Sequence, residues 1–277
     1  MIFDTHAHYD DPRFDADRDT ILMNLASAGV GCVVDVSAEF SGIDRVLALA
    51  DRYPFVYASV GVHPSDTALL TEGKMDILRE YAANAKVVAV GEIGLDYHYR
   101  LETDPGEADP PREVQKKWFR RQLQMAEELN LPVIIHSRDA SQDTLQIMRE
   151  AHASGIIGVI HCYSGSAETA REYLKMDYYL GIGGVVTFKN GKTLREVVRE
   201  APLEKLLLET DCPYLAPEPH RGQRNESGYL DLVAEEIARI KGIDKETVIG
   251  TTAENAERFY HIGKSGEVIR RGAEDDT

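Results

Sequence analysis

Residues 87–93 read VVAVGEI, an apolar run that contains a single carboxylate, Glu92. Near-continuous apolar runs rich in β-branched residues are typical of strands buried on both faces, as in a parallel sheet. Similar runs recur along the whole chain. They cover residues 2–4, 31–37, 55–62, 132–136, 158–162, 178–182 and 206–211. The sequence therefore predicts a sheet of eight buried parallel strands.

Amphipathic segments lie between these runs. In residues 112–130, the apolar side chains form one helical stripe, and residues 167–175 and 193–200 also predict helices. Strands that alternate with helices indicate βα units, and eight such units match a closed (β/α)8 TIM barrel of the α/β class. An open, doubly wound sheet is the alternative, but no glycine-rich dinucleotide-binding motif supports it.

The length of 277 residues suits a single barrel domain. We expect this domain to cover residues 1–261, and residues 262–277 to form a polar C-terminal tail that frays. Residues 101–111 (LETDPGEADPP) are acidic and rich in proline and glycine, which predicts a loop.

The net charge of −16 argues against broad, charge-driven binding to nucleic acid or anionic membranes. This charge is compatible with a phosphate-bearing substrate bound at one site, because bound divalent cations reverse the sign of the electrostatic field inside that site. Cys32, Cys162 and Cys212 show no CxxC spacing, and no apolar segment is long enough to span a membrane. We therefore expect a cytoplasmic protein, free of disulfides and of membrane contacts, and a monomer.

Ligand-type side chains occur at the ends of five predicted strands. They are His6, His8, Glu92, His136, His161 and Asp211. In a (β/α)8 barrel these strand ends open onto one face, and imidazole and carboxylate groups suit zinc, manganese or related ions. The set is too large for one catalytic ion with about three protein ligands, but it suffices for two ions about 3.5–4 Å apart. Glu92 is the best candidate for the bridging carboxylate.

Each of these histidines, taken alone, is more often a structural residue than a metal ligand. Together they occupy strand ends where apolar residues would otherwise stand, and burying several ionisable groups without an ion is costly. His63 also follows a predicted strand, so it either binds substrate or protonates a leaving group, with simple loop packing as the alternative. His98 and His220 are placed in loops, and His152 and His261 are expected at the surface.

Several motifs resemble the TatD family of metal-dependent deoxyribonucleases. They are DTHAHYD (4–10), SVGVHP (59–64), GEIGLDYHY (91–99), PVIIHSRDA (132–140), IHCYSG (160–165) and LLLETDCPYLAP (206–217). The resemblance implies an amidohydrolase-type (β/α)8 barrel with a two-metal phosphodiesterase site. The family's ligands fall on the same six residues. Glu209 matches a residue of the family that either contacts the ligands from behind the metals or binds metal itself. The chain departs from the family at Ser227, where proline is usual, and in a longer acidic loop (Glu102, Asp104, Glu107, Asp109) after residue 99.

The expected activity is 3′–5′ exonuclease cleavage of single-stranded DNA ends by a hydroxide that two divalent ions (Mg, Mn or Zn) activate. Asp211, Glu92 and His63 are the expected catalytic residues, with Asp211 accepting the proton of the nucleophile. Arg221, Asn225 and Lys189 are the expected substrate-binding residues, although Arg221 and Asn225 could also face loop backbone. The alternatives are an amide, ester or lactone hydrolase on the same barrel, and a non-catalytic metal-binding protein.

Overall fold

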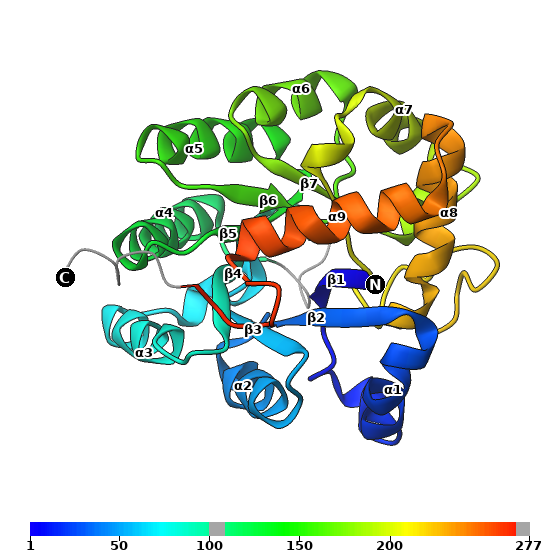
Figure 1. Ribbon diagram of the computed structural model, residues 1–277. Helices are drawn as coiled ribbons and strands as arrows, with labels where there is room; N and C mark the ends of the chain where they lie inside the picture. The colour runs from blue at the N-terminus through cyan, green and yellow to red at the C-terminus, as the bar shows by residue number, and fades with distance from the viewer. Residues whose placement is uncertain (100–108, 270–277) are drawn as a thin grey trace, which may run out of the picture.

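The computed structural model describes residues 1–99 and 109–269 and has the predicted (β/α)8 architecture (Figure 1). One sheet contains all eight strands in chain order, and every neighbouring pair is parallel. The strands are β1 (Ile2–Ala7), β2 (Val30–Val36), β3 (Val56–Val60), β4 (Val87–Asp96), β5 (Val133–Arg138), β6 (Gly158–Ile160), β7 (Tyr179–Ile182) and β8 (Leu206–Leu208).

The barrel closes where β1 meets the segment that follows β8. Ala7 and Cys212 form a parallel bridge, and the His8 amide donates to the Cys212 carbonyl at 2.9 Å. The Asp211 amide in turn donates to the His6 carbonyl at 2.9 Å. These bonds place three candidate ligands on the same rim of the barrel: His6 from β1, His8 just after β1, and Asp211 from beyond β8.

Helices surround the strands (Figure 1). They are α1 (Arg18–Asn24), α2 (Ile43–Arg52), α3 (Glu72–Ala82), α4 (Arg112–Leu129), α5 (Ser141–Ala153), α6 (Ala167–Lys175), α7 (Lys192–Glu200), α8 (Leu230–Lys241) and α9 (Lys245–Tyr260). Short 3-10 turns occur at η1 (Pro12–Phe14), η2 (Leu25–Ala28), η3 (Phe40–Gly42), η4 (Pro64–Leu69), η5 (Gly184–Thr187), η6 (Leu203–Lys205) and η7 (Ser227–Tyr229). The three helices predicted from the sequence are therefore present, within a residue of their expected bounds.

The inside of the barrel is a packed apolar core. It contains side chains from all eight strands, including Phe3, Tyr57, Ile134 and Leu207. The last turn of α9 and Ile262 pack against the same cluster. One end of the barrel is thus filled by hydrophobic contacts, as in other (β/α)8 barrels, and the polar groups gather at the other end.

The C-terminal segment differs from the expected frayed tail in its first eight residues. Residues 262–269 fold back on the barrel, where Ile262 bridges Val268 and the Tyr57 hydroxyl donates to the Gly266 carbonyl at 2.8 Å. Residues 270–277 lie outside the described part of the chain, as do Glu102, Asp104 and Glu107 of the acidic loop. Asp109, the remaining acid of that loop, accepts a hydrogen bond from the Tyr99 amide at 3.1 Å.

Strand β4 is longer than the sequence predicted, because it continues from Ile93 to Asp96. Gly94 faces His136 in the register of β4 and β5, with a φ angle of +148°. A methyl group at Gly94 would overlap the His136 carbonyl oxygen, so glycine is needed for this close approach. Within residues 1–99 and 109–269, none of the helices is both long and apolar enough to cross a membrane.

Candidate metal centre

The strand ends bring all six predicted ligands together around the carboxylate of Glu92. Glu92 Oε1 lies 2.7 Å from His136 Nδ1 and 2.9 Å from His161 Nε2. Glu92 Oε2 lies 3.4 Å from His6 Nε2 and 3.8 Å from His8 Nε2. Each oxygen of this buried carboxylate therefore faces its own pair of histidines, which is the arrangement expected of a bridging ligand.

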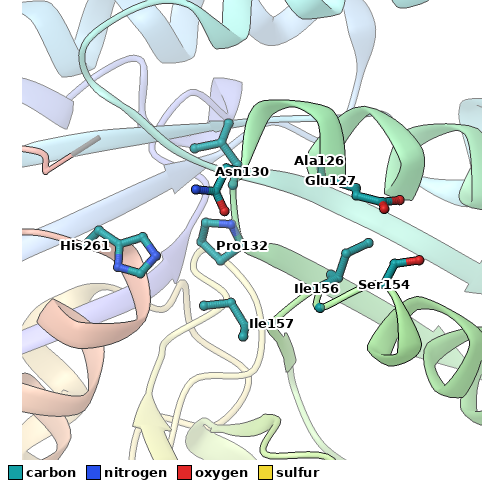
Figure 2. Close-up of a pocket in the computed structure, with 10 residues that line it drawn as sticks. Ala126, Glu127, Asn130, Pro132, Ser154, Ile156, Ile157 and His261 are labelled. Carbon is teal, nitrogen blue, oxygen red and sulfur yellow. The ribbon is translucent and has the colours of Figure 1, made fainter. Parts of the chain in front are cut away.

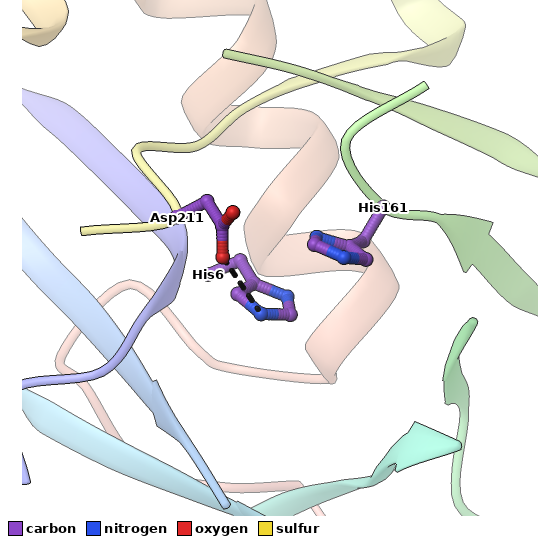
Figure 3. Close-up of side chains that lie close together, drawn as sticks. All are labelled: His6, His161 and Asp211. Atoms are coloured by element: carbon purple, nitrogen blue, oxygen red, sulfur yellow. Dashed lines mark ion pairs between the residues drawn. The ribbon is translucent and has the colours of Figure 1, made fainter. Parts of the chain in front are cut away.

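Asp211 completes the side of the cluster that contains His6 and His8. Its Oδ1 lies 3.4 Å from His8 Nε2 and 3.8 Å from His6 Nε2. Figure 3 shows Asp211, His6 and His161 reaching the centre from three different strand ends. The rings of His6 and His161 stack with their centroids 4.0 Å apart. These three residues form one group of ligand atoms that could hold an ion. His6, His8 and Glu92 form a second such group, and His63, Glu92 and His136 form a third.

His63 also lies at this cluster, as predicted for a residue at the mouth. Its Nε2 is 3.9 Å from Glu92 Oε1, and its ring packs against that of His136 with centroids 4.3 Å apart. The Ser65 amide donates to His63 Nδ1 at 3.3 Å. A neutral ring with this partner carries its hydrogen on Nε2, the atom that faces the cluster.

Burial and neighbouring charges divide the histidines into two kinds. Burial lowers the pKa of His6 to about 4 and that of His63 to about 3, assisted by the nearby charges of His161 and His136, respectively. Burial acts in the same direction on His8, but Asp211 and Glu92 raise its pKa to about 10. His6 and His63 are thus neutral, and His6 can offer a lone pair to an ion directly, whereas His8 must first lose a proton before it can bind one.

The Val36 carbonyl and Asp96 orient the rings of His8 and His136, each through the ring nitrogen that faces away from Glu92. His8 Nδ1 donates to the Val36 carbonyl at 2.7 Å, which leaves His8 Nε2 facing the cluster. Asp96, at the end of β4, lies with its Oδ2 3.1 Å from His136 Nε2. Sequence reasoning missed Asp96, although residues four apart on a strand share a face, so the spacing from Glu92 could have indicated it.

Glu209 supports the cluster from its outer side. Its carboxylate accepts a hydrogen bond from the Cys162 amide, and its Oε1 lies 3.7 Å from His161 Nδ1. Gly181 on β7 makes room for it, since a methyl group there would overlap this carboxylate. Burial raises the pKa of Glu209 to about 8, even though the His161 charge opposes the shift.

The loop after β8 is anchored by buried polar contacts. Asp4 Oδ2 accepts hydrogen bonds of 2.7 Å from both the Thr210 and the Ser227 hydroxyls. Asn225 donates from Nδ2 to the Thr210 carbonyl at 2.9 Å, and its Oδ1 accepts from the Glu226 amide at 2.9 Å. Of the two expected placements for Asn225, substrate and loop backbone, the structure shows the second.

The basic side chains at the mouth have different surroundings. Arg221 is exposed and lies over the Phe188 ring, 4.4 Å from its centroid, and Lys189 is exposed beside Phe188. Arg224 is instead paired with Asp17, at 2.6 Å from Nη2 to Oδ2. Arg221 and Lys189 therefore remain candidates for contact with substrate, whereas Arg224 holds the loop to the segment before α1.

The other histidines lie outside the cluster. His98 contacts Asp139 at 2.8 Å, and His220 stacks on Tyr229 with centroids 4.1 Å apart. His152 is exposed on α5. His261 lines a pocket of about 50 Å³ together with residues that precede β5 and β6, so this pocket lies at the opposite end of the barrel (Figure 2).

A (β/α)8 barrel with buried histidines and carboxylates at the carboxyl ends of its strands defines a metal-dependent hydrolase. The family described as TatD related DNase matches residues 3–261. The chain belongs to this family.

Known relatives support both the class and the fold. The "uncharacterized metal-dependent hydrolase YabD" of Bacillus subtilis is 44% identical, covering 95% of this chain and 100% of YabD. The similarly named YcfH of Escherichia coli is 38% identical, covering 96% and 97%. The crystal structure of YjjV, a TatD homolog from Escherichia coli K12, superposes with a TM-score of 0.86 at 30% identity, covering 95% of this chain and 98% of YjjV.

Proposed function

We propose that this protein is a deoxyribonuclease that uses two divalent ions to remove nucleotides from single-stranded 3′ ends of DNA. One observation carries the proposal. The two oxygens of Glu92 face separate pairs of histidines, so the site is divided into two adjoining halves. Two adjoining ions that share a carboxylate can bind both the attacking and the leaving oxygen of a phosphodiester, as in nucleases and polymerases.

The donor set fits two ions. His6, His8, Asp211 and one oxygen of Glu92 would hold the first ion, and His136, His161 and the other oxygen of Glu92 would hold the second. Such ions supply positive charge to a phosphate and acidify a water molecule. His6 suits the role of a metal ligand because burial keeps its imidazole neutral, with a pKa of about 4. Imidazole-rich ligation favours zinc or manganese over magnesium.

Asp211 and His63 have complementary tasks in this proposal. The Asp211 side chain is 17% exposed, more than the 5% of Glu92, so it can reach an incoming water molecule and accept its proton. His63 is neutral, with a pKa of about 3 that burial and the His136 charge impose. It therefore donates a hydrogen bond from Nε2 to a phosphate oxygen and does not protonate the leaving group.

The charge distribution favours a substrate that enters by its end. The chain carries a net charge of −16, so a long duplex would be repelled by most of the surface. Arg221 and Lys189 lie on the loops that follow β8 and β7, at the mouth. They are suited to bind the phosphates next to the one being cleaved.

Hydrolysis of a 3′-labelled, single-stranded DNA oligonucleotide tests the proposal. Chelator-treated protein should be inactive, and Mn²⁺ or Zn²⁺ should restore release of the label. Asp211→Asn should lower kcat by at least about 100-fold, the size expected for loss of a general base. Asp231→Asn is the matched control, because Asp231 pairs with Lys245 on the outer helices, and it should behave like the wild type.

Two results would contradict specific parts of the proposal. Equal cleavage of a closed circular single strand would refute the requirement for an end. No cleavage by protein that holds two ions per chain would leave a metal-dependent hydrolase but reject DNA as its substrate, and a panel of amides, esters and lactones would then identify the bond it cleaves.

A further inference from the structure

A cavity of about 290 Å³ opens directly beside the metal centre. His8 forms part of its wall, so a group bound there would be next to a phosphate held at the metals. The other walls come from the segment before η1, the loop between β2 and α2, and Tyr214 in the loop after β8. The cavity is close to the lower end of the range of small-ligand pockets, about 300–1,000 Å³.

Tyr214 forms an aromatic platform in this cavity. Its residue surface is 47% exposed, and the edge of its ring meets His8 with centroids 6.5 Å apart. The Arg13 guanidinium lies over the ring, 4.1 Å from the centroid. Asp11 holds that guanidinium by two hydrogen bonds, of 3.0 and 2.8 Å. The ring is therefore supported in place before any ligand arrives, which lowers the entropic cost of stacking on it.

The polar groups of the cavity are mainly acidic. Asp10, Glu39 and the Arg13-paired Asp11 contribute carboxylates to its wall, against the guanidinium of Arg45. Arg45 is itself engaged, because its Nη1 donates to the Asp10 carbonyl at 2.8 Å. Such a lining repels a phosphate and accepts hydrogen bonds from uncharged N–H and O–H groups.

We propose that this cavity binds the uncharged nucleoside attached to the phosphate at the metal centre, with its base stacked on Tyr214. The inference rests on the proposed phosphodiesterase function and deepens it. A terminal nucleoside has a base, a sugar and no second phosphate. The acidic walls exclude the next phosphate of a continuous strand, so the cavity selects strand ends.

Two esters with the same leaving group test this proposal: thymidine 5′-(4-nitrophenyl phosphate) and methyl 4-nitrophenyl phosphate. The metal-loaded wild type should prefer the thymidine ester in kcat/KM. Tyr214→Ala should reduce that preference at least about fivefold, because base–aromatic stacking contributes about 1–3 kcal/mol. Tyr214→Phe should keep it within about twofold. Leu215→Ala, which alters the neighbouring exposed side chain, is the control and should also keep it.

A second measurement is independent of turnover. Saturation-transfer NMR with free thymidine on metal-free protein should show contacts to the base in the wild type and in Tyr214→Phe, but not in Tyr214→Ala. Thermal unfolding of each variant verifies that it is folded.

The acidic wall has a test of its own. Glu39→Gln should improve hydrolysis of the thymidine ester that carries an additional 3′-phosphate, relative to the ester without it.

The outcomes separate this inference from the function on which it rests. If the wild type hydrolyses neither ester, the phosphodiesterase proposal fails, and the NMR contacts alone decide the nucleoside site. If the wild type hydrolyses both esters equally, or if Tyr214→Ala keeps both the preference and the thymidine contacts, the nucleoside site is refuted.

Discussion

Asp96 holds the ring of His136 from the side opposite Glu92. His136 Nδ1 is 2.7 Å from Glu92 Oε1, and His136 Nε2 is 3.1 Å from Asp96 Oδ2. When one ring nitrogen gives its lone pair to an ion, the other keeps a hydrogen for which it needs an acceptor. A carboxylate in that position orients the ring and makes it a stronger ligand. Asp96 therefore acts on the metal through His136.

Replacing Asp96 with asparagine should weaken metal binding by about 10- to 100-fold, the usual effect of losing such a partner. The fold should persist, because the amide occupies the same volume. Competition with a chromophoric chelator measures the affinity. Asp231→Asn, remote from the cluster, should leave it unchanged. Equal affinities for Asp96→Asn and the wild type would show that Glu92 alone orients His136.

Single-residue roles differ in how well the sequence predicts them. The convergence of the six candidate ligands could be predicted because each stands at the end of an apolar run, where a barrel has its mouth. The role of Arg224 could not, because its partner Asp17 is 207 residues away and no local pattern indicates the pair. For the same reason, Asn225 could be placed near the site but not assigned to the Thr210 carbonyl.

At the scale of elements, the pairing of β4 with β5 brings the two halves of the site together. Apolar periodicity predicted both strands, but not that β4 continues to Asp96, because Gly94 usually marks the end or a bulge of a strand. Gly94 pairs with His136 in this register, so it sets the distance between the strand of Glu92 and the strand of His136.

Gly94→Ala should therefore destabilise the protein by about 3 kcal/mol or more, because the added methyl group forces β4 and β5 apart. Gly155→Ala is the matched control. Gly155 also has a positive φ angle, +85°, but its methyl group would meet no atom within 4 Å. Only the conformational cost of about 1–2 kcal/mol is expected there. Urea unfolding measures both, and equal losses would contradict the steric argument.

Over the whole molecule, many basic side chains serve the contacts between neighbouring helices. Arginine–glutamate pairs join α3 to α4, α4 to α5, α5 to α6 and α6 to α7. These pairs are Arg79–Glu128, Arg121–Glu72, Arg120–Glu150, Arg149–Glu172 and Arg171–Glu200. Each contributes about 0–1 kcal/mol to stability, and each engages a guanidinium that would otherwise be free to bind an anion. This supports the proposal that a polyanionic substrate contacts the protein only at the mouth of the barrel.

Metal removal should also make stability depend on pH. In the metal-free protein, burial opposes the charge on His8 and His136. The carboxylates of Asp211, Asp96 and Glu92 nevertheless raise their pKa values to about 10 and about 9, above the 6.5 of an ordinary histidine. The folded state therefore holds protons that the unfolded chain releases. This contribution to stability is fully present below about pH 6.5 and is lost as the pH rises through 9 to 10.

Divalent ions take the place of these protons, so the metal-loaded protein does not lose that contribution. We expect the difference in Tm between loaded and chelator-treated protein to widen by several degrees from pH 7 to pH 9.5, since about 1 kcal/mol shifts Tm by about 2–4 °C in a domain of roughly this size. Calorimetry at matched ionic strength measures it. Asp211→Asn removes a carboxylate that raises the pKa of His8, so the pH dependence of its metal-free form should be flatter. A difference that stays constant or shrinks with pH would mean that the ions do not replace protons on these two rings.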